Sequence, residues 1–328
     1  MNFSEFQSFR EQLLRERSDI ADCAETNLYR TLARLLPPSE ATPDGPVHRC
    51  HLAEAWANRF GLPAESAPRA FISCGVRDSL ERLFRHYAKQ PVRLWLPEDN
   101  YPVYRDLATA TGLTPRFFST LPEPIWPNQP PEHGPEILLI TNPLKPLGRW
   151  LDDREVQSLT TWLAQSPQRR LLIDAVYTFE MRFHESTARL LSTGKTLLLH
   201  SLTKGWLSPR LFGVALVPES DAPALLPHFR ENPPAQPSLV RAREFLLRYP
   251  DMPHTIACEL MQANHRLNAM VPTRTTRLTG NSTPGYFIAL ATPWTELLER
   301  DRLLGLPAAV FGSPRNDITI LSSLNFAT

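Results

Sequence analysis

The spacing of apolar residues divides the chain into a helical opening, a segment of short apolar runs and a mixed tail. Near the start, apolar residues recur every three or four positions over 3–17 and 27–36, which predicts two helices. A proline-rich stretch at 37–46 ends this section, and the next helices are predicted around 51–60 and 78–88.

Short, densely apolar runs bounded by turn residues follow at 92–97, 136–141, 170–176, 196–202 and 213–218. Such runs are typical of strands that are buried on both faces of a parallel sheet. Helical periodicity at 103–112 and 153–165 separates some of them. This alternation predicts an α/β fold with a mainly parallel sheet flanked by helices.

The tail has the pattern of a smaller α+β domain. Proline-rich stretches at 121–135 and 228–237 are expected to be surface loops. After the second, the pattern predicts helices around 238–248, 254–268 and 294–304, with strands at 273–278, 286–291 and 318–323. We therefore expect an N-terminal segment, 1–44, packed with the small domain, a large domain, 45–248, and a small C-terminal domain, 249–328.

Composition narrows the class of protein. Of 328 residues, 42% are hydrophobic and 21% charged, which suits a folded chain with a sizeable core. A net charge of +1 argues against nucleic-acid binding through bulk charge. No apolar run is long enough for a membrane span, the cysteines are scattered, and the charged N-terminus lacks a secretion signal, so we expect a cytoplasmic protein. His48, Cys50 and His51 match no common zinc spacing, so no metal site is expected.

Polar residues follow the predicted strands at the edge where parallel α/β sheets bind ligands. In chain order they are Gly75, Val76 and Arg77 after FIS, Tyr101 after LWLP, Asn142 after LLIT, Asp174 and Tyr177 after LLID, and Ser201, Lys204 and Arg210 after LLLH. A glycine turn before a helix, an aromatic ring, an amide, a carboxylate and a lysine together suit an aromatic, phosphorylated aldehyde. Pyridoxal phosphate (PLP) meets that description.

The chemistry of this cofactor assigns the catalytic roles. The Lys204 amine is predicted to form an imine, a Schiff base, with the aldehyde and to serve as the base. Asp174 is predicted to hold the pyridine nitrogen protonated, which makes the ring an electron sink. Asn142 and Tyr177 are predicted to hydrogen-bond the ring hydroxyl, and Tyr101 to stack on the ring, with Tyr104 as the alternative.

The phosphate is predicted to lie at the start of a helix. Backbone N–H groups that follow Gly75 would bind it, helped by the Ser201 hydroxyl and the Arg210 guanidinium.

Three motifs resemble those of the aspartate aminotransferase superfamily, the fold-type I PLP enzymes. NPLKPLG (142–148) resembles NPxNPTG, DAVY (174–177) resembles D-x-x-Y, and SLTK (201–204) resembles S-x-[ST]-K. PEDNYPVY (97–104) and SCGVRDSLERL (73–83) are similar to two further segments. Within that superfamily, the chain is most similar in style of motif to the histidinol-phosphate aminotransferase and threonine-phosphate decarboxylase group. The resemblance implies transfer of an amino group from an amino acid or related amine by a homodimer.

One departure from the family concerns the substrate. Its aminotransferases carry a late-strand arginine for the substrate α-carboxylate, whereas ITILSS (318–323) has Thr319 at about that place. Either Arg315 or another arginine (Arg182, Arg274 or Arg277) binds the carboxylate, or the substrate lacks one. A decarboxylase, or a lyase that eliminates or cyclises, is therefore the alternative enzyme, and a non-catalytic cofactor-binding protein is the alternative of another class.

Overall fold

A seven-stranded sheet forms the centre of the larger part of the molecule. The computed structural model describes residues 2–37, 45–100, 102–130, 134–280 and 283–327. The strand order of the sheet is β2-β8-β7-β6-β5-β3-β4. The strands are β2 (Ala70–Ser73), β3 (Arg93–Pro97), β4 (Arg116–Phe118), β5 (Glu136–Thr141), β6 (Arg169–Asp174), β7 (Thr196–Ser201) and β8 (Gly213–Leu216).

Strand β8 is the exception to the parallel arrangement. It runs antiparallel to both β7 and β2, while the remaining strands share one direction. Only residues 202–212 join β7 to β8. Because a parallel crossover takes a dozen residues or more, this short connection favours the antiparallel pairing. The sheet is thus mainly parallel, as predicted, with one reversed strand.

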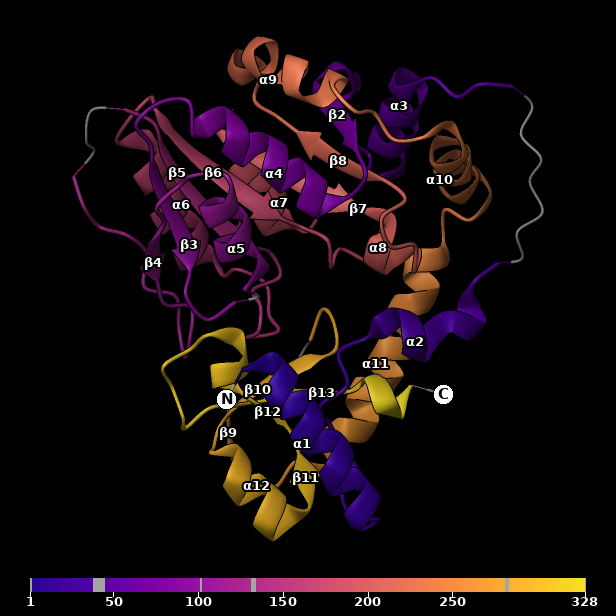
Figure 1. Ribbon diagram of the computed structural model, residues 1–328, viewed down its shortest axis with the longest axis vertical. Helices are drawn as coiled ribbons and strands as arrows, with labels where there is room; N and C mark the ends of the chain where they lie inside the picture. Colours follow the sequence, from indigo (N-terminus) through magenta and orange to yellow (C-terminus); the bar gives the residue numbers. More distant parts are fainter. Residues whose placement is uncertain (1, 38–44, 101, 131–133, 281–282, 328) are drawn as a thin grey trace.

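Helices cover both faces of the large sheet (Figure 1). Alternate residues of each strand pack against different helix layers, because successive side chains point to opposite faces of the sheet. In β5, for instance, Ile137 and Leu139 pack in the cluster of one face, and Leu138 and Ile140 in the cluster of the other. The first layer contains α4 (Val76–Tyr87), α5 (Val103–Ala110) and α9 (Ala222–Arg230), and the second α3 (Arg49–Arg59), α6 (Asp153–Ala164), α7 (Glu185–Leu191) and α10 (Gln236–Arg248).

Two smaller sheets form the lower part of the molecule in Figure 1. The order of the four-stranded antiparallel sheet is β12-β13-β10-β9, and β1 pairs with β11 in parallel. The strands are β1 (Ala21–Asp22), β9 (Thr276–Arg277), β10 (Phe287–Ala291), β11 (Leu303–Leu304), β12 (Leu306–Pro307) and β13 (Thr319–Ser322). Helices α1 (Phe3–Glu16), α2 (Leu28–Leu32), α11 (Met252–Met270) and α12 (Trp294–Asp301) surround them.

The N-terminal segment belongs spatially to this lower part. Phe6 and Phe9 of α1 lie against Trp294 of α12, with ring centroids 6.5 Å and 5.5 Å away. Helix α11 extends from the large sheet down into the small sheets (Figure 1). The division at 44/45 and 248/249 remains a prediction, and residues 38–44 lie outside the described part of the chain.

The structure corrects several predicted elements. Helix α9 extends to Arg230, so the predicted loop at 228–237 is confined to 231–235 between two helices. The strand predicted at 273–278 is only the two-residue β9. Within the described ranges, no helix is long and apolar enough to cross a membrane. Neither do three His, Cys, Asp or Glu side chains gather there as a metal site.

Candidate active site

A pocket of about 350 Å³ is lined by residues from the carboxyl ends of the large-sheet strands, from the small sheets and from the N-terminal segment. Eight of the ten residues predicted to bind the cofactor line it, namely Gly75, Val76, Arg77, Asp174, Tyr177, Ser201, Lys204 and Arg210. Tyr101, the predicted stacking ring, lies outside the described residues. Asn142 is not part of the lining.

Asp174 ends strand β6 as a buried carboxylate with two hydrogen-bond donors. The Tyr104 hydroxyl donates to its Oδ2 at 2.6 Å, and the Val176 N–H donates to its Oδ1 at 3.0 Å. Burial, and then the negative charge of Asp174, raise the pKa of Tyr104 well above its ordinary value. Tyr104 therefore stays a neutral donor, and its hydroxyl is directed to Asp174.

Lys204 follows β7 in the short helix α8 (Leu202–Gly205). Its Nζ lies 5.2 Å from the centroid of the Tyr177 ring. Burial lowers the pKa of Lys204 to about 8, and attraction by Asp174 opposes part of that effect. A large fraction of Lys204 is therefore the neutral, nucleophilic amine near pH 8.

Lys145 is a second amine in the same pocket, which sequence reasoning missed. Its Nζ lies 3.6 Å from the centroid of the same Tyr177 ring. Burial lowers the pKa of Lys145 to about 7, Asp174 opposes the shift, and the charge of Lys204 adds to it. The signal was present in the motif, because Lys145 of NPLKPLG stands at the second asparagine of NPxNPTG.

Asn142 is held away from the pocket by its own hydrogen bonds. Its Nδ2 donates to the hydroxyls of Ser186 and Thr187, both at 2.8 Å, and its Oδ1 accepts from the Leu151 N–H at 3.1 Å. The side chain is fully buried. Asn142 thus ties the loop after β5 to the start of α7, and the geometry does not support the role that the sequence assigned to it.

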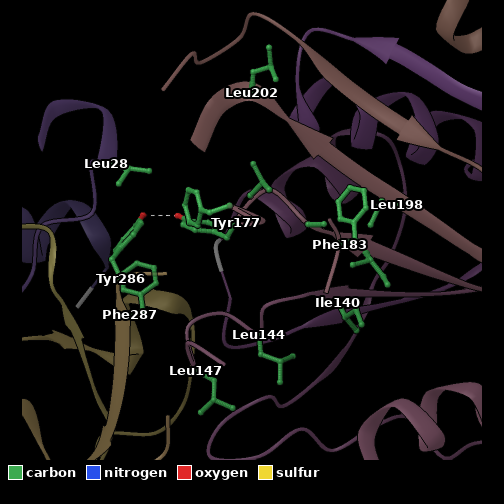
Figure 2. Packing of buried hydrophobic residues seen from close by; sticks show 14 of the residues in the cluster. Leu28, Ile140, Leu144, Leu147, Tyr177, Phe183, Leu198, Leu202, Tyr286 and Phe287 are labelled. Atoms are coloured by element: carbon green, nitrogen blue, oxygen red, sulfur yellow. Dashed lines mark hydrogen bonds between the residues drawn. The ribbon is translucent and has the colours of Figure 1, made fainter. Parts of the chain in front are cut away.

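Tyr177 connects the large sheet to the small sheets. Its hydroxyl lies 2.6 Å from that of Tyr286, and the Tyr286 hydroxyl also donates to the Thr26 carbonyl at 3.2 Å. Figure 2 shows the two tyrosines pointing toward each other, with Phe287 beside Tyr286. Burial, and then Tyr286, raise the pKa of Tyr177 well above its ordinary value, so the Tyr177 hydroxyl stays neutral.

The turn at Gly75 requires glycine at two positions. Gly75 has a φ of +137°, which favours glycine, and it precedes the first turn of α4. Opposite it, a Cβ on Gly213 would lie 2.5 Å from the Gly75 Cα. The pairing of Ser73 with Gly213 brings the end of β2 to the start of β8. Arg210, three residues before Gly213, lines the same pocket as the start of α4, whose first N–H groups suit an anion.

The predicted carboxylate-binding arginines do not line the pocket. Arg315 is paired with Asp317, with Nη2 2.6 Å from Oδ2, and 40% of its side chain is exposed. Arg274 pairs with Asp301, and the buried Thr319 hydroxyl donates to the Thr292 carbonyl at 2.6 Å. Instead, the small sheets supply aromatic residues that the sequence did not single out, namely Tyr286, Phe287 and Phe311.

Comparison with known proteins agrees with this architecture. No family model matches the chain. A Thermus thermophilus aspartate aminotransferase double mutant superposes with a TM-score of 0.70 over 99% of this chain and 92% of that one, at 15% identity.

Two curated Arabidopsis thaliana proteins match in sequence. The chain is 23% identical over 217 residues to "Probable aminotransferase TAT1", and 24% identical over 201 residues to "S-alkyl-thiohydroximate lyase SUR1". These matches cover 63% and 58% of this chain, but only 46% and 41% of the relatives, so less than half of each relative is spanned. The chain has the fold of the fold-type I PLP-dependent aminotransferases.

Proposed function

We propose that this protein is a PLP-dependent aminotransferase that acts on an amino acid or a related amine. The observation that carries the proposal is the meeting of Lys204 and Asp174 in one pocket, at the ends of neighbouring parallel strands. The Lys204 amine has a pKa of about 8 in that setting, which suits both nucleophilic attack and proton transfer.

The residues that line the pocket fit the cofactor. The backbone after Gly75 with Arg77, Ser201 and Arg210 would hold the phosphate, since Gly213 leaves room for the close approach of the turn. Asp174 would hold the ring nitrogen, and Tyr177 the ring hydroxyl. When bound, PLP supplies an aldehyde that takes up amines and a ring that accepts electrons from a breaking bond.

The side chains of this chain then have distinct tasks. Tyr104 and the Val176 N–H each donate to one carboxylate oxygen of Asp174 and so hold that carboxylate in place. Lys204 exchanges protons near neutral pH and is proposed to move the proton at the substrate Cα. The aromatic residues Tyr286, Phe287 and Phe311 exclude water from the side of the small sheets.

Visible absorption tests this function directly. The purified protein should gain a band near the violet edge with PLP, and amine donors should shift it. Lys204→Ala should abolish the band, whereas Lys89→Ala, at an exposed lysine outside the pocket, should retain it. A wild-type protein that stays colourless with PLP would remove the enzyme proposals, and so would a band that survives Lys204→Ala. A band that no amine shifts would favour the non-catalytic alternative.

A lyase or decarboxylase is the second candidate. The match to "S-alkyl-thiohydroximate lyase SUR1" favours it, as does the absence of Arg315 and Arg274 from the pocket lining. The fate of the amino group distinguishes the reactions. A transaminase leaves the amino group on the cofactor until an oxo acid arrives, whereas an eliminating enzyme releases it as ammonia. A decarboxylase leaves the amino group on the product and releases carbon dioxide.

We further propose that the protein works in the cytoplasm as a homodimer. Support for the homodimer comes from the resemblance to the aspartate aminotransferase superfamily, and support for the cytoplasm from the scattered cysteines of the sequence. Sedimentation should then give about twice the chain mass of 37.2 kDa, and cell fractionation should recover the protein with cytosolic markers. A monomer, or recovery elsewhere, would contradict this part of the proposal.

A further inference from the structure

The pocket contains more positive than negative charge. Its cationic side chains within the described part of the chain are Arg77, Lys145, Lys204 and Arg210, and its sole carboxylate there is Asp174. Such an excess matches a ligand with more than one anionic group, because unbalanced charges in an enclosed site are costly.

The chain uses lysine sparingly, which makes the second pocket amine notable. Only four of its 35 Lys and Arg residues are lysines, namely Lys89, Lys145, Lys195 and Lys204. Two of these four line this one pocket. Lys195 instead donates to the carbonyls of Leu163 and Ser166, and Lys89 is exposed.

The proposed function engages every one of these cations except Lys145. Arg77 and Arg210 line the pocket together with Gly75, where the phosphate is proposed to bind, and Lys204 would be engaged by the aldehyde. The backbone of Lys145 is fixed, because its N–H donates to Thr141 Oγ1 at 2.8 Å and its carbonyl accepts from Asn100 Nδ2 at 3.2 Å. Its amine lies over the ring of Tyr177, 3.6 Å from the centroid, and close enough to Lys204 for that charge to lower its pKa.

We propose that Lys145 binds the carboxylate of the substrate, so that the substrate class is α-amino acids rather than simple amines. This inference rests on the proposed function. The α-carboxylate and α-amine of an amino acid share one carbon atom, so a group that binds the carboxylate must lie close to the lysine that exchanges the amine. Lys145 meets that condition, since both amines lie over the ring of Tyr177, 3.6 Å and 5.2 Å from its centroid, and the charge of Lys204 acts on Lys145.

Matched ligands test the role of Lys145. Wild-type protein loaded with PLP is titrated with the twenty standard amino acids. It is also titrated with the amines that six of these amino acids give on decarboxylation. The shift of the visible band is the readout in both titrations. Lys145→Met should raise the apparent dissociation constant of the responding amino acids about ten- to a hundredfold, the loss expected for a hydrogen bond to a charged group. The constants for the amines should stay within about twofold of wild type.

Two further variants serve as controls. Lys145→Arg, which retains the charge, should recover most of the affinity for amino acids, and Lys89→Met should behave as wild type. Borohydride reduction followed by peptide mass spectrometry should place the cofactor label on Lys204 in every variant.

Failure of this inference can be told apart from failure of the proposed function. A protein that never binds PLP overturns both. If the protein binds PLP, three kinds of result overturn only the role of Lys145. The first is that Lys145→Met binds amino acids as wild type does, and the second is that it loses affinity for amines and amino acids equally. The third is that wild type responds to amines alone or to none of the ligands. A label on Lys145 overturns both assignments of the lysines.

Discussion

The two walls of the pocket differ in chemistry. The wall from the large sheet, here called the charged wall, carries Asp174, Lys204 and Lys145, which lie at the end of an apolar strand or three or four residues after one. The wall from the small sheets is aromatic, with Tyr286, Phe287 and Phe311. The apolar wall lets the charged groups of the other wall act at low dielectric. The same apolar wall determines which substrate side chains fit.

Asp174→Asn should produce the largest effect, because among the described residues that line the pocket it removes the one carboxylate. With the best amine donor, the reaction rate should fall at least about a hundredfold, the range typical for loss of an acid–base or electrostatic partner. Asp153→Asn is the matched control, since that side chain is 91% exposed. Rates for Asp174→Asn within a few-fold of wild type would show that the charge on this wall does not drive the chemistry.

The pH dependence of cofactor capture should follow Lys204. Only the neutral amine attacks an aldehyde, and the folded pKa of about 8 lies below the ordinary value of 10.5. The initial rate of band formation should therefore be half-maximal near pH 8 and fall about tenfold for each pH unit below that.

Asp174→Asn sharpens this test. Because Asp174 raises the pKa of Lys204, the midpoint should move to lower pH in that variant. A midpoint above pH 10 in wild type would mean that Lys204 is solvated rather than enclosed.

Asn142→Ala should separate structural from functional roles within the motif NPLKPLG. It removes one hydrogen bond each from the Leu151 N–H, the Ser186 hydroxyl and the Thr187 hydroxyl, at a cost of about 2–4 kcal/mol in the free energy of unfolding. Melting temperature should fall by several degrees, while PLP affinity should stay within about threefold of wild type. The same substitution at the exposed Asn316 should change neither quantity. A large loss of cofactor affinity at unchanged stability would restore the role predicted from the sequence.

The sequence predicted the charged wall better than the aromatic one for a physical reason. Asp174 and Lys204 follow dense apolar runs, and strand ends in a parallel sheet are brought to one edge by the fold itself. Tyr286 and Phe311 approach the pocket only because the small sheets pack against the large one, a long-range contact with no local pattern. Asn142 and Lys145 show a finer limit. They are three positions apart in one motif, and the path of the loop decides which side chain faces the pocket.

The smallest of the expected effects is that of Lys145→Met on the stability of the protein without cofactor. In the folded protein the pKa of Lys145 is about 7, below the ordinary 10.5 expected of the unfolded chain. The unfolded state therefore binds the proton more tightly, and the buried charge destabilises the fold fully below pH 7 and progressively less as the pH rises to 10.5. Lys145→Met should raise the melting temperature at pH 6 by roughly 2 °C or more, and by less at pH 9. Lys89→Met should show no such gain, because Lys89 is exposed. A gain in melting temperature for Lys145→Met that is equal at both pH values would reflect better packing alone. A gain that decreases as the pH rises would show that the charged wall retains its second amine at a cost in stability, as expected of a group kept for binding.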